Sequence, residues 1–188
     1  MSSSEGKGKD KDKGKNKLDT TRRAHPYDRA DFMGTKSARA VNPEVIAKTI
    51  KKMKRALLVI GSNLSDEELA KVVEFAKVSG LEVVGAGGVA GRLKDIPNHY
   101  MNLHLLVGYI IEGWKGFDGN GKYDALVFVG HIYYHLSPML RALSNFSSTR
   151  LISIDRYYYP SADMTFGNLS DEEFIQALDR LIDIMREE

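Results

Sequence analysis

Two apolar runs of the sequence, Ala125–Val129 and Leu151–Ile154, each end abruptly in polar and aromatic residues. The residues that follow the runs are Gly130, His131, Tyr133, Tyr134, Asp155, Arg156, Tyr157 and Tyr158. A carboxylate at a strand end suits ribose hydroxyls, an arginine pairs with phosphate, and tyrosines stack on a flat ring. Tyrosine is also enriched at protein interfaces. These residue types favour a nucleotide-binding edge and a subunit contact equally.

Two earlier apolar runs end in glycines, Gly61-Ser62 after the first and the stretch from Gly85 to Gly91 after the second. Glycine lets the backbone approach a pyrophosphate and point its amides at it. The pattern Gly85-x-Gly87-x-x-Ala90 matches a dinucleotide fingerprint only in part, because no helix is expected before Pro97. A flexible connection between two elements is an equally good interpretation.

These observations define two sets of candidate residues. The candidate cofactor-binding residues are Gly61, Ser62, Gly87, Gly88, Gly130, His131, Asp155 and Arg156. The candidate interface residues are Tyr133, Tyr134, Tyr157 and Tyr158. No metal site is expected, because His99 and His104 have no carboxylate pattern beside them.

The sequence lacks the motifs of several enzyme classes. It has no Gly-x-Ser-x-Gly elbow, no Walker A loop and no His-Glu-x-x-His. It also has no cysteine, which excludes disulfides, a cysteine nucleophile and iron–sulfur clusters held by thiolates. His131 has no oriented nucleophile near it in sequence, so no catalytic residue is predicted, and any redox role must be indirect.

The elements that would position these residues alternate between helices and buried strands. Continuous apolar runs predict strands at 56–60, 81–84, 125–129 and 151–154. Helices are predicted from Asn42-Pro43, from a Ser65–Glu68 capping box to Gly80, over 98–111, over 137–145, and from a Ser170–Glu173 capping box. This order predicts an α/β fold, a three-layer, mostly parallel Rossmann-like sheet with helices on both faces. Residues 130–135 are expected to form a turn at the edge where such sheets bind ligands.

Composition indicates three regions. Residues 1–20 are Lys/Gly/Asp-rich and are expected to be disordered, residues 21–41 to form an extended arm, and residues 42–188 a single domain. Net charge is +4 over residues 1–23 (eight basic, four acidic), +5 over 24–55 (eight, three) and −7 over 56–188 (eleven, eighteen). The basic tail is expected to act in solubility, not in nucleic-acid binding. No apolar run reaches the length of a membrane span, so a cytoplasmic location is expected.

From about Gly34 to its end the chain resembles the epsilon subunit of the archaeal acetyl-CoA decarbonylase/synthase complex, the carbon monoxide dehydrogenase/acetyl-CoA synthase of methanogens and their relatives. The segments that carry the resemblance are Asn42-Pro43-Glu44, Arg55 to Ser62, Tyr100-Met101-Asn102, Trp114-Lys115-Gly116, Asp118-Gly119, Tyr123 to Gly130, Tyr133-Tyr134 and, above all, Ile154 to Tyr158 with Pro160, Ala162-Asp163-Met164 and Phe166 to Leu169. Ala56, where the family is expected to have proline, and the long tail depart from the pattern.

The resemblance implies a deoxyhypusine synthase-like NAD/FAD-binding fold. It also implies assembly with the large alpha subunit as an α2ε2 carbon monoxide dehydrogenase component, with nickel and iron–sulfur clusters only in that partner. The implied roles are stabilisation of the component and help in passing electrons to FAD, without catalytic residues of its own. The alternative hypothesis is a stand-alone flavin- or nucleotide-binding domain.

Overall fold

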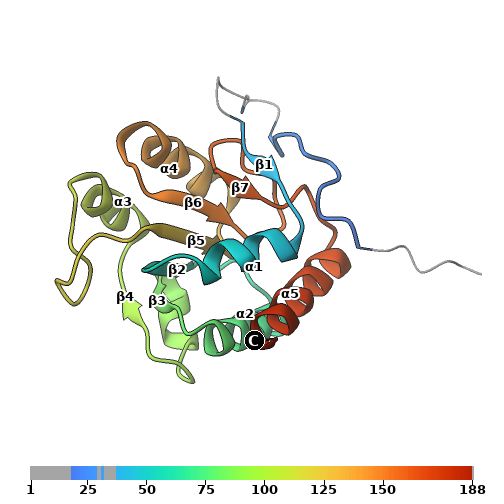
Figure 1. Cartoon of the computed structure of the whole chain (residues 1–188), viewed down its shortest axis with the longest axis horizontal. Coiled ribbons are helices and arrows are strands. Elements are labelled where there is room, and N and C mark those ends of the chain that lie inside the picture. Colours follow the sequence, from blue (N-terminus) through green and yellow to red (C-terminus); the bar gives the residue numbers. More distant parts are fainter. Residues whose placement is uncertain (1–17, 29–30, 32–36, 188) are drawn as a thin grey trace, which may run out of the picture.

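The computed structural model describes residues 18–28, 31 and 37–187 (Figure 1). Along the chain its elements are β1 (Arg39–Ala40), α1 (Pro43–Lys51), β2 (Ala56–Ile60), α2 (Asp66–Ser79), β3 (Glu82–Gly85), the 3-10 helix η1 (Gly87–Arg92), β4 (His99–Tyr100), α3 (Leu103–Ile111), β5 (Ala125–Val129), α4 (Tyr133–Phe146), β6 (Arg150–Ser153), β7 (Met164–Thr165) and α5 (Asp171–Arg186). None of the described helices is long and apolar enough to cross a membrane.

The strands form one parallel sheet in the order β1-β7-β6-β5-β2-β3-β4. At its centre β2 pairs with β5, from Ala56 opposite Ala125 to Ile60 opposite Val129. Every residue of these two strands is buried. Continuous apolar runs formed the central strands because a parallel sheet is covered on both faces.

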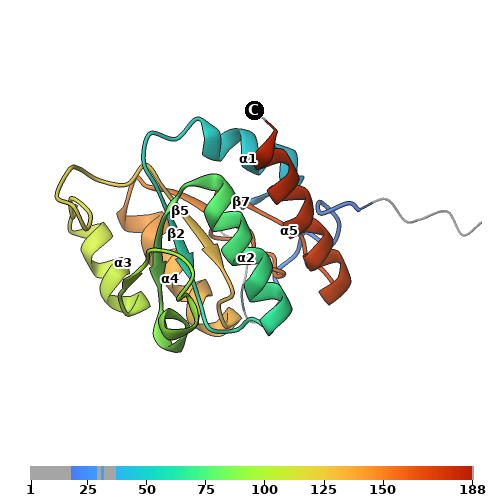
Figure 2. The same ribbon diagram turned by 90° about the horizontal axis from the view of Figure 1, so that it is seen from below.

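Helices cover both faces of this sheet. α1, α2 and α5 lie on one side, and α3 and α4 lie on the other (Figures 1 and 2). Each side has its own buried cluster: Phe75 and Phe174 belong to the first, Leu106 and Leu140 to the second. The predicted three-layer α/β fold with a mostly parallel sheet is confirmed.

Both predicted capping boxes begin helices. Ser65 accepts from the Glu68 amide while the Glu68 carboxylate accepts from the Ser65 amide, and Ser170 and Glu173 do the same for α5. The C-cap of α2 is Gly80, which adopts the left-handed conformation. Glycine adopts it without steric cost because it has no Cβ.

The predicted turn over residues 130–135 is limited to residues 130–132, and the predicted start of a helix at Ser137 is wrong. α4 begins at Tyr133, because Ile132 acts as its N-cap and its carbonyl accepts from the amides of His135 and Leu136. Pro138 lies inside the helix. Its ring removes one amide hydrogen bond of the helix, while Leu136 and Leu140 on either side of it are fully buried.

Two more sequence predictions are corrected in the stretch between β3 and α3. The glycine-rich segment expected to lack a helix forms η1. The helix predicted from residue 98 starts only at Leu103, after β4 and the N-cap Asn102, whose side chain accepts from the amide of His104. β4 formed because its edge position beside β3 supplies backbone partners that a local pattern does not reveal.

The arm segment lies against the folded body. The Thr20 hydroxyl donates to the Val41 carbonyl at 2.7 Å, and the Thr20 carbonyl accepts from the Gly167 amide at 2.7 Å. Thr20 is fully buried, so residues 18–20 belong to the packed chain and the predicted tail ends before them. The remainder of that tail, residues 1–17, lies outside the described residues.

Candidate functional site

The candidate cofactor-binding residues all lie at the carboxyl edge of the sheet. Four neighbouring strands bring them there: β6 before Asp155 and Arg156, β5 before Gly130 and His131, β2 before Gly61 and Ser62, and β3 before Gly87 and Gly88. The chain turns to opposite faces of the sheet after β2 and β5, which makes the gap between their ends the usual nucleotide site of such folds.

That gap is closed by direct contact between the two strand ends. The Gly61 amide donates to the Val129 carbonyl and the Asn63 amide to the Gly130 carbonyl, both at 2.8 Å. A Cβ on Gly61 would overlap the Gly130 carbonyl oxygen. Gly130 has φ of 74°, and a Cβ there would lie 2.5 Å from Cγ of Leu64. Glycine is required at both positions for packing, and no space is left for a pyrophosphate.

His131 and Asp155 are enclosed behind this contact. The Asp155 carboxylate accepts from the amide of His131 at 3.0 Å and from that of Arg156 at 2.8 Å, so it ties the end of β6 to the end of β5. Its side chain is buried, and burial raises its pKa to about 6. Burial also lowers the pKa of His131 to about 4, and its Nε2 lies 3.1 Å from the Val59 carbonyl. A neutral, enclosed imidazole that donates to the backbone has no access to a substrate.

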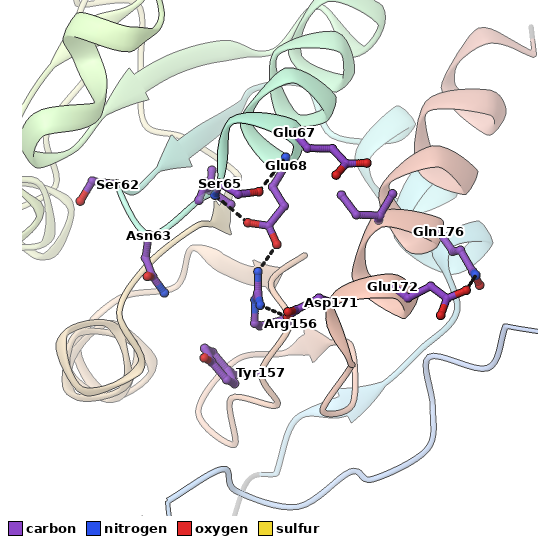
Figure 3. Close-up of a pocket in the computed structure, with 12 residues that line it drawn as sticks. Ser62, Asn63, Ser65, Glu67, Glu68, Arg156, Tyr157, Asp171, Glu172 and Gln176 are labelled. Carbon is purple, nitrogen blue, oxygen red and sulfur yellow. Dashed lines mark hydrogen bonds and ion pairs between the residues drawn. The ribbon is translucent and has the colours of Figure 1, made fainter.

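Among the described residues, Arg156 is the one basic side chain that lines a groove of about 760 Å³ between the first turns of α2 and α5 (Figure 3). Its guanidinium forms ion pairs with Glu68 and Asp171 and lies 5.1 Å from the centre of the Phe174 ring. Glu67 and Glu172 add further carboxylates to the lining. Arg156 therefore joins α2 to α5, and the lining of the groove is acidic.

These surroundings do not fit the pyrophosphate of FAD. The positive charge of Arg156 is already matched by Glu68 and Asp171, and the other carboxylates would repel a phosphate. Ser65 and Ser170 each accept one first-turn amide, those of Glu68 and Glu173, which are then not available to an anion. Gly87 and Gly88 are exposed at the start of η1, away from this groove and outside its lining.

The four candidate interface tyrosines divide into buried and exposed side chains. Tyr133 is 3% exposed and its hydroxyl donates to Asp31 at 2.9 Å, while Tyr158 is 1% exposed and donates to the Ala38 carbonyl at 2.8 Å. Neither can present its ring to a partner in this fold. Tyr157 is half-buried beneath Tyr27 of the arm, whose ring centre lies 4.4 Å away. Tyr134 is 63% exposed and remains a candidate contact residue.

The sequence predicted an extended arm over residues 21–41 but not which of its residues contact the body. The Asp31 carboxylate accepts from Tyr133, Ser137 and Arg141, and thus fastens the arm to α4. Polar residues scattered through residues 21–41 gave no periodic signal, so only the tertiary structure reveals this contact.

The apolar outer side of α3 was also missed. The sequence indicated a buried helix, yet Leu105 is 50% exposed and Tyr109 42% exposed. The sequence did contain a signal for this surface. The predicted helix has apolar residues on all sides, and a helix of that kind is normally covered all round. A side that the chain itself leaves uncovered is therefore a candidate contact surface.

Within residues 18–28, 31 and 37–187, no three His, Cys, Asp or Glu side chains lie together in a way that could hold a metal ion. The edge of the sheet thus brings the predicted residues near one another, but their contacts are with the protein itself.

Comparison with known proteins agrees with the resemblance seen in the sequence. The family model for the CO dehydrogenase beta subunit/acetyl-CoA synthase epsilon subunit matches residues 20–182. The acetyl-CoA decarbonylase/synthase complex subunit epsilon 1 of Methanosarcina barkeri is 38% identical over 156 residues, covering 81% of this chain and 92% of that protein. The subunit epsilon of Methanothrix soehngenii is 36% identical over 178 residues, covering 90% of this chain and 95% of that protein.

Among solved structures, an exopolyphosphatase-related protein from Bacteroides fragilis is 12% identical, with a TM-score of 0.45 over 76% of this chain and 43% of that one. At that score the likeness says nothing about fold or function. The family model and the curated relatives, in contrast, span most of the sequence at substantial identity. The chain belongs to the CO dehydrogenase beta subunit/acetyl-CoA synthase epsilon subunit family.

Proposed function

We propose that this chain is an accessory, non-catalytic epsilon subunit of the carbon monoxide dehydrogenase component of an acetyl-CoA decarbonylase/synthase complex. In this proposal it assembles as α2ε2 with the large nickel–iron–sulfur subunit and stabilises that subunit. The observation that carries the proposal is the family membership together with a sheet edge whose polar residues are engaged within the chain.

Any part in electron transfer is indirect in this proposal. Without cysteine the chain has no thiolate to hold an iron–sulfur cluster. Its contribution to passing electrons towards FAD is then to hold the partner's clusters in a defined protein environment.

The proposal is tested by co-expressing the tagged full chain with the large subunit and purifying on the tag. We expect the two to elute together in equimolar amounts from a size-exclusion column. We also expect the rate of carbon monoxide oxidation to decay more slowly on warming when the chain is present than when it is omitted. A chain that elutes alone, from a mixture in which the large subunit is folded and active, would overturn the proposal.

The alternative function, a stand-alone flavin- or nucleotide-binding domain, is favoured by the groove at the carboxyl edge of a parallel sheet. The acidic lining and the pairing of Arg156 argue against it. Titration of the purified chain with FAD, followed by flavin fluorescence and calorimetry, separates the two functions. We expect no saturation up to millimolar FAD, whereas micromolar binding would establish the alternative.

A further inference from the structure

Large apolar side chains are exposed mainly on one side of the molecule. Apart from Tyr27 of the arm, the most exposed ones in the described chain are Tyr100, Leu105, Tyr109, Ile132, Tyr134 and Phe146. Five of them lie on β4, on α3 or around the start of α4, and Phe146 lies at the far end of α4. We call Tyr100, Leu105, Tyr109, Ile132 and Tyr134 the α3/α4 face.

Charge is distributed just as unevenly over the two helical layers. α3 contains no Asp, Glu, Lys or Arg, and α4 contains only Arg141, which pairs with Asp31. α2 and α5 on the opposite side begin with Asp66-Glu67-Glu68 and Asp171-Glu172-Glu173 and carry further charges along their lengths. The cores of protein interfaces are depleted in charge and enriched in tyrosine, which is the composition of the α3/α4 face.

No other helix or strand lies over α3 and α4 in the part of the chain that the structure describes (Figures 1 and 2). Their inner sides are already committed to the sheet: Leu106, Val107 and Leu140 are buried against it. Within the described residues, the exposed side chains therefore add nothing to the core. Exposed apolar area of this kind is characteristic of a surface that another protein covers.

The chain's own N-terminal segment is a poor occupant for this face. Residues 1–17 contain six lysines, and Met1 is their only large apolar residue. Such a segment offers almost no apolar area to bury, whereas the α3/α4 face offers no carboxylate for its lysines.

A second copy of the chain is an alternative occupant, and overall charge does not oppose it, because the whole chain carries a net charge of only +2. Family membership favours a different subunit, because the relatives are named as subunits of a larger complex. The oligomeric state of the chain alone is therefore one of the outcomes of the test below.

From these observations we infer that the α3/α4 face is the surface through which the chain docks on the large subunit of the complex. The inference rests on the proposed function and adds to it the face and the residues. Leu105, Tyr109 and Tyr134 are its expected anchors, because they are large, exposed and lie on regular helices.

The test measures binding of the full chain to the large subunit by biolayer interferometry. One variant, Leu105→Glu with Tyr109→Glu, places two charges on the outer side of α3, and a milder one, Tyr134→Ala, removes a single ring. Gln176→Glu on α5 is the matched control, because it adds a charge to an exposed position on the opposite side of the sheet. Thermal unfolding of each variant alone establishes that it is folded.

We expect both α3/α4 variants to raise the Kd at least about tenfold and the control to leave the Kd unchanged. Variants that are folded and bind as tightly as the unmodified chain would overturn the inference while leaving the proposed function intact. If the unmodified chain itself does not bind, the proposed function fails first. If the unmodified chain alone is a dimer and the Leu105→Glu/Tyr109→Glu variant is a monomer, the face serves self-association and the inference is overturned.

Discussion

Gly61 and Gly88 are both glycines that follow a central strand, but only one of them is required by its neighbours. A Cβ on Gly61 would meet the Gly130 carbonyl, whereas nothing lies within 4 Å of a Cβ on Gly88. We expect Gly61→Ala to lower the free energy of unfolding by at least about 2–3 kcal/mol, because the backbone must shift. Gly88→Ala is expected to stay within about 0.5 kcal/mol.

Urea denaturation of the two variants measures the difference. Equal small effects would contradict the close contact of the β2 and β5 ends. Equal large effects would point to a requirement at Gly88 that its surroundings in this chain do not explain.

Asp155 and His131 have opposite effects on the pH dependence of stability. The pKa of Asp155 is raised from 3.8 to about 6, so its ionisation costs the folded state stability as pH rises from about 4 to 6. The pKa of His131 is lowered from 6.5 to about 4, so its contribution is present above pH 6.5 and is lost as pH falls to about 4. The two changes are each roughly 3 kcal/mol and largely cancel.

Replacing one group should expose the effect of the other. In Asp155→Asn the stability should rise by up to roughly 3 kcal/mol from pH 4 to pH 6.5 relative to the unmodified chain, since of these two groups only His131 still titrates. In His131→Gln it should fall as pH rises over the same range. Thermal melts at half-unit pH steps test this. Identical pH profiles for Asp155→Asn and the unmodified chain would contradict the raised pKa of Asp155.

At the scale of elements, Arg156 joins α2 to α5. Its side chain is 18% exposed and that of its partner Glu68 is 7% exposed. Arg156→Met keeps the apolar stem but leaves the Glu68 carboxylate buried without its cation. We expect a loss of about 2–3 kcal/mol in unfolding free energy.

The matched control is Arg180→Met, which removes an ion pair with Glu44 between α5 and α1. Both side chains of that pair are nearly half exposed, 45% and 43%. Its expected cost is below about 1 kcal/mol, because solvent screens the pair. The ratio of the two costs, measured by chemical denaturation, is the observable, and similar costs would show that Arg156 does not hold the helices together.

At the scale of the whole molecule, the described part of the N-terminal arm is held on the folded body. Thr20, Tyr27 and Asp31 bind the body, through Gly167, Tyr157 and α4 respectively. Deleting residues 1–17 should leave Tm within about 2 °C, whereas deleting residues 1–31 should lower it by at least about 5 °C, because those contacts are lost. Calorimetry of both truncated chains checks this, and a large effect of the shorter deletion would contradict the assignment of the first stabilising contacts to residues 18–31.

The local sequence pattern alone determined the central elements of the fold. β2 and β5 coincide with their apolar runs, and both capping boxes begin helices, because burial on two faces and helix capping depend on residues adjacent in the chain. The absence of cysteine likewise follows from composition alone, and it means that this chain holds no thiolate-bound cluster.

Only the tertiary structure decided what the residues at the strand ends do. Whether Arg156 is free for a phosphate depends on Glu68 and Asp171, which come from helices far away in sequence. The two-residue strands β1, β4 and β7 exist only through their pairing with neighbours. Leu105 and Tyr109 belong to an apolar helix in the sequence, but which of its sides stays uncovered depends on where the sheet and α4 lie. Local patterns specify elements, and long-range contacts decide which side chains remain available to a partner.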